Sequence, residues 1–219
     1  MIPLYIVGVG GAAKEILQLF LKKSSLSEKY IFQGLIDVGI TQHTICLLNQ
    51  EYIVFNEDWF FSSQVNEQKQ IAVLFAIGTP KILSKVISKY KIYKNIVFPN
   101  LIDSDIDISG ITDIGQGNII AQSTVVTVDV IIGDFNYINR GVQIGHDVTI
   151  GNSNVINPSS VISGGVVIGN QNLLGTNSTI LQYCSIGNQN IIGASALVLK
   201  DISKSGCYIG IPAKQKLNE

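Results

Sequence analysis

Two histidines occur in the 219-residue chain, and one of them, His146, is followed directly by an acid, Asp147. An imidazole is the natural base near neutral pH for nucleophilic attack by an amine or a hydroxyl. A carboxylate against the other ring nitrogen fixes the tautomer and raises the basicity of the ring. We therefore predict a catalytic pair at His146 and Asp147, against the alternative of a surface histidine. For His43 we expect a solvated loop.

A second chemical motif lies near the N-terminus, in the segment Gly8-Val9-Gly10-Gly11-Ala12-Ala13. It follows a short apolar run and precedes apolar residues at helical spacing, so it matches G-x-G-x-x-G/A between a strand and a helix. Backbone amides and the helix N-terminus could hold a pyrophosphate there, and the alternative is a tight turn without a ligand. Because only about a hundred residues precede the next region, a mononucleotide is expected.

The elements that would position this loop alternate in type. Apolar patterns predict four strands, at 4–7, 30–36, 71–77 and 96–99, with a helix after the glycine loop and another at about 81–90. This alternation indicates a small parallel α/β sheet. Asp37 follows the second strand and suits a ribose or base donor group, although acids also form turns there. Gly78 follows the third strand and would permit close approach of the same ligand.

Beyond residue 101 the sequence repeats every six residues. Every sixth residue from Ile102 to Val198 is Ile, Leu or Val, which makes 17 positions without a break. Six residues suit short strands joined by tight corners, with one aliphatic side chain per strand filling a narrow bore. We expect Gly and Asn to tolerate the backbone angles of the corners, and Cys184 to pack inside one. The repeat therefore predicts a β-helix.

Charge separates the same two regions. Residues 1–101 contain ten Lys and seven Asp or Glu, whereas residues 102–198 contain Arg140, seven Asp and no Lys or Glu. The lysines return near the C-terminus, at Lys200, Lys204, Lys214 and Lys216. We therefore predict a boundary near residue 100, with domains at 1–100 and 101–219.

Whole-chain composition excludes several classes of function. A formal net charge of −1 and a pI of about 6.1 argue against an electrostatic binder of nucleic acid or membranes. Charged residues make up only 14% of the chain and mean hydropathy is +0.34, but no apolar run reaches the roughly 18 residues of a membrane span. Three cysteines and no apparent signal peptide favour a reducing cytoplasm.

The two regions together resemble a known family. His146 and Asp147 belong to the arrangement N-x-G-x-x-x-x-H-D-x-x-I-G, and the repeat ends in Ile-Gly-Ala-Ser-Ala-Leu-Val-Leu-Lys-Asp-Ile followed by Gly-x-Pro-Ala-Lys. This resembles the sugar O-/N-acyltransferases with hexapeptide repeats, which include bacterial sialic acid O-acetyltransferases and UDP-4-amino-sugar N-acetyltransferases of the PglD type. The resemblance implies a small Rossmann-like domain before a left-handed parallel β-helix, in a cytoplasmic homotrimer for bacterial glycan biosynthesis. It also implies three hexads a coil and hence roughly five to six coils.

The same resemblance implies a role for each candidate residue. His146 is the general base, Asp147 raises its basicity and Asn139 helps to place the acceptor amine. The nucleotide-sugar contacts Gly10, Gly11, Ala12, Asp37 and Gly78. Acetyl-CoA lies along the β-helix between neighbouring subunits, without a metal, and contacts Val155, Thr176, Gly193, Ala194 and Lys214. A 3′-phosphate seeks cationic neighbours, which would explain the returning lysines; the alternative is a solvated polar tail.

Three positions depart from the family pattern. Val155 stands where relatives often have a second histidine near the thioester, and Ala12 replaces a bulkier or polar residue. Gly145 precedes the base where Glu is frequent. The base itself is present.

These features predict an acetyl-CoA-dependent N-acetyltransferase that acts by direct attack on a nucleotide-linked amino sugar, a UDP-4-amino-4,6-dideoxy sugar on the resemblance. The alternative is O-acetylation of sialic acid or another sugar hydroxyl. A zinc β-helix enzyme needs three histidines and residues 102–198 have one, while a scaffold or ice-binding β-helix would need regular Thr or Ser arrays. A trimer would cover apolar residues expected on the surface, at Val128, Val130 and Ile131.

Overall fold

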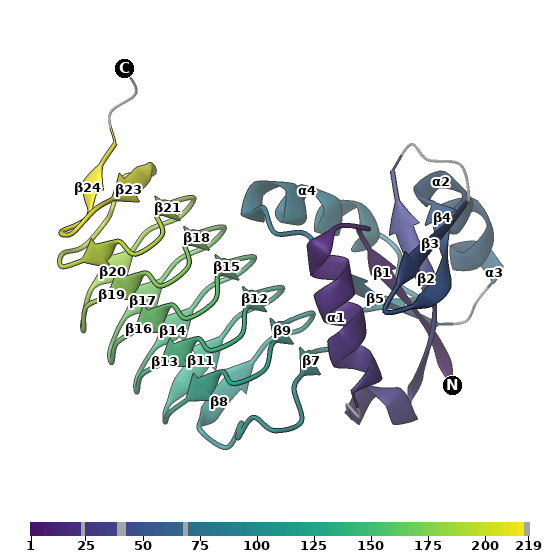
Figure 1. Cartoon of the computed structure of the whole chain (residues 1–219), viewed down its shortest axis with the longest axis horizontal. Helices are drawn as coiled ribbons and strands as arrows, with labels where there is room; N and C mark the ends of the chain where they lie inside the picture. The colour runs from purple at the N-terminus through teal and green to yellow at the C-terminus, as the bar shows by residue number, and fades with distance from the viewer. Residues whose placement is uncertain (23–24, 39–42, 68–69, 217–219) are drawn as a thin grey trace.

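The computed structural model describes residues 1–22, 25–38, 43–67 and 70–216. An α/β sheet and a stack of β-strand coils follow one another along the longest axis of the molecule (Figure 1). The last described strand, β24 (Lys214–Gln215), lies at the far end of the stack, away from the α/β sheet. Among the described residues, no helix is long and apolar enough to cross a membrane. The predicted fold class, a small α/β unit followed by a left-handed parallel β-helix, is confirmed.

The α/β unit contains six strands in the order β3-β4-β2-β1-β5-β6, all parallel to their neighbours except β3, which runs antiparallel to β4. The strands are β1 (Ile2–Val7), β2 (Tyr30–Asp37), β3 (His43–Leu47), β4 (Gln50–Asn56), β5 (Ile71–Phe75) and β6 (Ile96–Val97). The helices are α1 (Gly11–Leu21), α2 (Glu57–Trp59), α3 (Val65–Glu67) and α4 (Pro80–Tyr90), with a 3₁₀ turn at Ser25–Glu28 and a π turn at Phe60–Gln64.

The β3–β4 hairpin was not predicted, and the expectation of a loop at His43 is wrong. His43 begins β3 and pairs with Val54 of β4. The turn uses Leu48 and Asn49, whose φ angles are 51° and 62°, as in the primed turns that suit hairpins. Because neither residue is glycine, the sequence carries only a weak turn signal.

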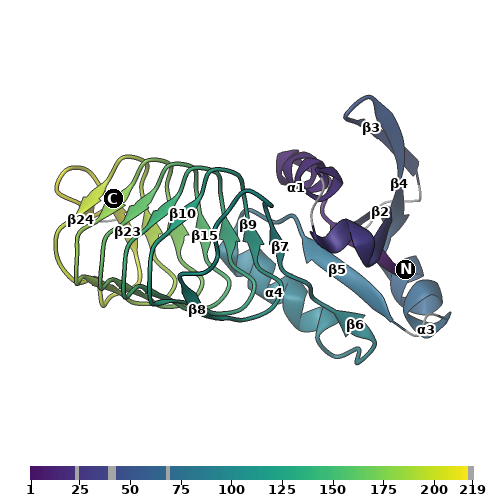
Figure 2. The same ribbon diagram turned by 90° about the horizontal axis from the view of Figure 1, so that it is seen from below.

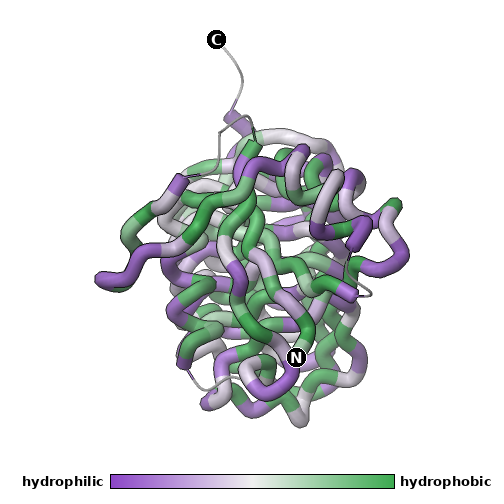
Figure 3. The backbone as a smooth tube through the Cα atoms, turned by 90° about the vertical axis from the view of Figure 1, so that its right-hand side faces the viewer, coloured by the Kyte–Doolittle hydropathy of each residue, from purple (hydrophilic) through white to green (hydrophobic). Residues whose placement is uncertain are grey.

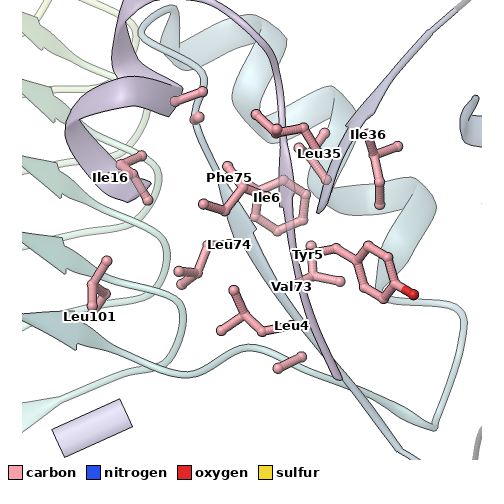
Figure 4. Close-up of a cluster of buried hydrophobic side chains, with 14 of the residues drawn as sticks. Leu4, Tyr5, Ile6, Ile16, Leu35, Ile36, Val73, Leu74, Phe75 and Leu101 are labelled. Carbon is pink, nitrogen blue, oxygen red and sulfur yellow. The ribbon is translucent and has the colours of Figure 1, made fainter. Parts of the chain in front are cut away.

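The core of the α/β unit extends into the β-helix. Figure 4 shows Leu4 and Ile6 of β1 and Leu74 of β5 in one apolar cluster. Ile16 of α1 and Leu101, the first strand residue of the β-helix, belong to the same cluster. The α/β unit therefore packs against the β-helix through shared apolar side chains.

The β-helix has three sheets, which we call sheets 1, 2 and 3, and Figure 2 shows its coils as stacked loops. Their strands are parallel except the last strand of sheet 1, which runs antiparallel to its neighbour. Sheet 1 contains β7 (Leu101–Ile102), β9 (Ile119–Ile120), β12 (Tyr137–Ile138), β15 (Val155–Ile156), β18 (Leu173–Leu174), β21 (Ile191–Ile192), β23 (Cys207–Ile209) and β24 (Lys214–Gln215). Sheet 2 contains β10 (Val125–Val126), β13 (Gln143–Ile144), β16 (Val161–Ile162), β19 (Thr179–Ile180) and β22 (Leu197–Val198). Sheet 3 contains β8 (Ile111–Ile114), β11 (Val130–Ile132), β14 (Thr149–Ile150), β17 (Val167–Ile168) and β20 (Ser185–Ile186).

Repeat aliphatics line the bore and stack one coil apart. Ile138 pairs with Ile156, and Ile144 pairs with Ile162, each 18 residues further on. Hydrophobic and hydrophilic segments succeed one another along the chain in Figure 3. The prediction that every repeat aliphatic fills the bore fails at Ile108, which is 49% exposed. The chain between β7 and β8 is irregular, and Ile106 packs against the core there instead.

The left-handed backbone of the corners falls at one fixed position of the repeat. From Gly117 to Ser195, every sixth residue has a φ between 55° and 69°, three positions after each aliphatic. The glycines directly after the aliphatics serve stacking instead. A Cβ on Gly133 would lie 2.6 Å from Asn152 Oδ1 and 2.8 Å from the carbonyl oxygen of Gly151. The expectation that Gly and Asn tolerate the corner angles is therefore confirmed at Gly117, Gly141, Gly165 and Asn177, and it is wrong for the glycines directly after the aliphatics.

A column of asparagines fills one corner. Its members are 18 residues apart and buried: Asn118, Asn136, Asn154, Asn172 and Asn190. The backbone N–H of Asn154 donates to Asn136 Oδ1 at 3.0 Å, and its side-chain Nδ2 donates to Gly169 O at 2.9 Å. The column satisfies polar groups inside the stack that would otherwise be buried without partners.

Another corner is filled by Cys184 and Val130, which are both buried. The cysteine packs inside a corner as expected, and burial raises the pKa of its thiol. Val128 and Ile131 are exposed as predicted, but the prediction for Val130 is wrong. Its side chain occupies the inner corner position four residues after the repeat aliphatic.

Candidate active site

The predicted base lies on an exposed corner of the β-helix. His146 follows β13 at the corner between sheets 2 and 3, and its side chain is 55% exposed, against 64% for Asp147. The distance from His146 Nδ1 to Asp147 Oδ2 is 2.7 Å. When Nδ1 is protonated it donates this hydrogen bond, which leaves Nε2 as the nitrogen that accepts a proton.

The backbone of this corner fixes the positions of His146 and Asp147. Asp147 has a φ of 58°, a conformation that aspartate adopts more readily than most residues, and its N–H donates to Val128 O one coil earlier at 3.1 Å. The His146 ring lies against Gly164, one coil later, because a Cβ there would lie 2.6 Å from ring atom Cε1. The glycine therefore gives the imidazole its space.

A cavity of about 340 Å³, here called the loop–coil pocket, lies between the glycine loop and the β-helix. It brings together five of the predicted site residues, Gly11, Ala12, Gly78, Asn139 and Val155. Its other lining residues are Glu15, Tyr137, Asn157 and Pro158. Positions distant in sequence thus converge on one pocket.

The loop glycines have no packing reason to be glycine. A Cβ on Gly10, Gly11 or Gly78 would meet nothing within 4 Å, and none of the three has a positive φ. Gly8 differs, because its φ is 108° and a Cβ would lie 2.8 Å from Ala76 O. Gly10 is the N-cap of α1, so the open space lies at a helix N-terminus, which favours an anionic group.

Asp37 ends β2, and its Oδ1 accepts a hydrogen bond from the N–H of Val38 at 2.8 Å. It is not among the residues that line the loop–coil pocket. The structure therefore places Asp37 at the predicted strand end but does not bring it to the pocket with the glycines.

The predicted acetyl-CoA contacts follow the β-helix away from the pocket. Thr176, Gly193 and Ala194 lie one and two coils beyond Asn157 and Pro158, on the same corner between sheets 1 and 2. Val155 is buried in sheet 1. Lys214 lies in β24 and lines a separate cavity of about 360 Å³ with Lys200 at the end of the stack.

Within one chain the base and the pocket are apart. Asn139 lies on the corner before β13 and His146 on the corner after it, so a strand of sheet 2 separates them. His146 is not among the lining residues of the loop–coil pocket. A single chain therefore does not assemble the predicted catalytic set.

Glu15 and Tyr137 line the pocket although no sequence pattern pointed to them, and Arg140 contacts Glu15. Arg140 was visible as the only base among residues 102–198. Burial, and then the charge of Glu15, raise the pKa of the Tyr137 phenol, so this side chain remains a donor. Among the described residues, no three His, Cys, Asp or Glu side chains form a group suited to a metal ion.

Several solved structures share the fold of the whole chain. A variant of perosamine N-acetyltransferase from Caulobacter crescentus, in complex with CoA and GDP-perosamine, is 24% identical with a TM-score of 0.86 over 99% of this chain and 97% of that one. The acetyltransferase domain of PglB from Neisseria gonorrhoeae is 20% identical with a TM-score of 0.83, over 98% and 99%. WeeI from Acinetobacter baumannii is 22% identical with a TM-score of 0.78, over 99% and 100%.

The chain has the fold of these proteins. The likeness extends through both the α/β unit and the β-helix, since almost all of each chain is covered. No protein-family model and no curated protein matches the sequence. At this level of identity the likeness establishes architecture, and activity has to be argued from the site.

Proposed function

We propose that the protein transfers the acetyl group of acetyl-CoA to the amine of a nucleotide-linked amino sugar. The observation that carries the proposal is the His146–Asp147 pair, an imidazole hydrogen-bonded to a carboxylate on an exposed corner of an otherwise charge-poor β-helix. A fold shared with a perosamine N-acetyltransferase that binds CoA and GDP-perosamine supports it.

The acetyl group passes directly from acetyl-CoA to the acceptor amine, with His146 as the general base. His146 Nε2 takes a proton from the acceptor amine as its nitrogen attacks the thioester carbonyl, and Asp147 stabilises the imidazolium that forms. The tetrahedral intermediate then collapses, the carbon–sulfur bond breaks, and the CoA sulfur leaves with a proton returned by the imidazolium. A backbone amide of the β-helix stabilises the oxyanion, and the amide of Gly164 is the candidate because this residue contacts the ring.

The loop–coil pocket would hold the nucleotide-sugar. The open space at Gly10, Gly11 and Gly78 suits the diphosphate, because amides at the start of α1 attract anions. Asn139, on the opposite wall, would place the sugar amine. In this assignment residues 1–100 supply the wall that binds the diphosphate, and residues 101–219 supply the opposite wall and the chemistry.

A neighbouring copy would complete the site. Because β13 separates Asn139 from His146 in one chain, the base that serves a loop–coil pocket comes from an adjacent subunit of a homotrimer. Exposed apolar side chains near this corner, Val125, Val128 and Ile131, would be covered by that contact. Acetyl-CoA would run between subunits past Thr176, Gly193 and Ala194, with its 3′-phosphate near Lys214.

The proposal is tested by following thiol release from acetyl-CoA with three acceptors: a UDP-linked 4-amino sugar, a GDP-linked 4-amino sugar and free sialic acid. Turnover is expected with a nucleotide-linked amino sugar, and the UDP and GDP substrates decide the nucleotide, which we predict to be UDP. Activity with sialic acid alone would instead support O-acetylation and contradict the proposal.

A further inference from the structure

Glu15, on the first helix, contacts two β-helix residues beside the loop–coil pocket. Its Oε1 accepts from Arg140 Nη1 at 2.7 Å, and its Oε2 accepts from the Tyr137 hydroxyl at 3.1 Å. Tyr137 begins β12, and Arg140 lies three residues later on the corner. Because Asn139 stands between them in sequence, Glu15 is bonded to the chain on both sides of Asn139.

Glu15 also forms part of the pocket. Together with Tyr137 and Asn139 it lines both the loop–coil pocket and a second cavity of about 270 Å³ between α1 and the β-helix. It lies four residues after Gly11, about one helical turn, so the two residues share a face of α1. One turn of helix therefore carries both a glycine of the loop and the acid that is bonded to the opposite wall.

This contact contributes mainly to the geometry of the pocket and little to the stability of the fold. The side chains of Glu15 and Arg140 are 47% and 58% exposed, and ion pairs this open contribute little to folding. Tyr137 is buried, however, so its hydroxyl depends on Glu15 for direction. The carboxylate sets where the Tyr137–Arg140 segment stands relative to α1.

We propose that Glu15 is a positioning residue of the nucleotide-sugar site, which holds the Asn139 wall of the pocket at a fixed separation from the glycine loop. This inference rests on the function proposed above. A ligand that contacts both walls binds a preformed pocket when Glu15 is present and must order the pocket itself when Glu15 is lost. Acetyl-CoA, bound further along the β-helix, keeps its affinity in either case.

Steady-state kinetics of Glu15→Ala, Glu15→Gln and Tyr137→Phe test this role. Loss of two hydrogen bonds to a charged group in Glu15→Ala should raise KM for the nucleotide-sugar roughly tenfold or more, while KM for acetyl-CoA stays within about twofold. The other two variants each lose one bond and should show smaller increases of the same kind, so that Glu15→Gln partly rescues the loss.

The matched control is Lys91→Met. Lys91 Nζ lies 3.5 Å from Asp134 Oδ2, so this pair also joins the α/β unit to the β-helix, but it lines neither cavity. Both KM values should be unchanged in the control. An equal rise in the two KM values of Glu15→Ala, or the same selective rise in Lys91→Met, would overturn the positioning role.

Calorimetry separates this inference from the proposed function. If the wild-type protein binds neither the UDP- nor the GDP-linked amino sugar, the proposed function fails, and the positioning role fails with it. If the wild type binds one of them and Glu15→Ala binds it equally well, only the positioning role is wrong. Circular dichroism checks each fold, and if Glu15→Ala is unfolded, Glu15→Gln and Tyr137→Phe decide the outcome.

Discussion

Two sets of glycines in this molecule differ in whether packing requires them. In the β-helix, Gly133 and Gly164 are needed because a Cβ would strike the neighbouring coil or the His146 ring. In the α/β unit, Gly10, Gly11 and Gly78 face open space. Packing explains the first set and leaves the second unexplained, which supports the proposal that a ligand approaches these three glycines. Residues without a structural reason are therefore the best guide to function here.

The largest expected effect is the loss of activity when His146, the proposed base, is replaced. Like the glycines that face open space, this residue is not required by packing. His146→Ala should lower kcat by roughly 10²- to 10⁴-fold, because a positioned general base contributes about that much. Its unfolding midpoint should match the wild type, since the side chain is more than half exposed. Thiol release and thermal unfolding measure the two quantities. Full activity in His146→Ala would return this residue to the class of surface histidines.

Asparagine offers a comparison within the β-helix. Asn154→Ala removes a buried side chain that bonds Asn136 and Gly169 and accepts from the backbone of Asn172, so the free energy of unfolding should fall by on the order of 3 kcal/mol. Asn170→Ala is the control, because Asn170 is half-buried in an equivalent column nearer the surface, where water can replace the lost bonds. Chemical denaturation measures both, and equal losses would show that burial does not set the cost.

Alanine substitution directly tests whether packing requires one set of glycines and not the other. Gly133→Ala should lower the free energy of unfolding by about 1–3 kcal/mol, because backbone atoms must move to admit the Cβ. Gly11→Ala should leave stability unchanged or slightly raised, yet increase KM for the nucleotide-sugar roughly tenfold. Denaturation and kinetics on the same preparations give both values. The comparison breaks down if Gly11→Ala is the less stable of the two or keeps its KM.

The smallest effect concerns thiol reactivity. Burial, and then the nearby charge of Asp201, raise the pKa of Cys184, whereas Cys46 is exposed. Because the thiolate is the reactive form, iodoacetamide at pH 8 should modify Cys46 first and Cys184 only on unfolding. Peptide mass mapping over time measures the order. Early modification of Cys184 would show that its corner opens in the native state.

How far the sequence predicts this molecule depends on how regular each part is. The six-residue period locates the β-helix because each coil repeats the same contacts, and it fails at Ile108, where the first coil is irregular. The hairpin at 43–56 was not predicted, because its turn residues are Leu48 and Asn49 and not the glycine that usually marks such a turn.

The candidate site divides in the same way. The glycine loop and the His146–Asp147 pair are local in sequence and can be recognised there. Glu15 and Tyr137 meet only when α1 packs against the β-helix, over a separation of 122 residues that no local pattern encodes. Asp37 shows the converse, since its predicted strand end is correct but the structure does not bring it to the pocket.

A crystal structure of the protein with CoA and a nucleotide-linked amino sugar tests the central claim, that the pocket of one copy and the base of another form one site. We predict the diphosphate at Gly10 and Gly11, and the sugar nitrogen within hydrogen-bonding distance of His146 Nε2 from a neighbouring subunit. A sugar nitrogen bound away from every copy of His146 would contradict the account.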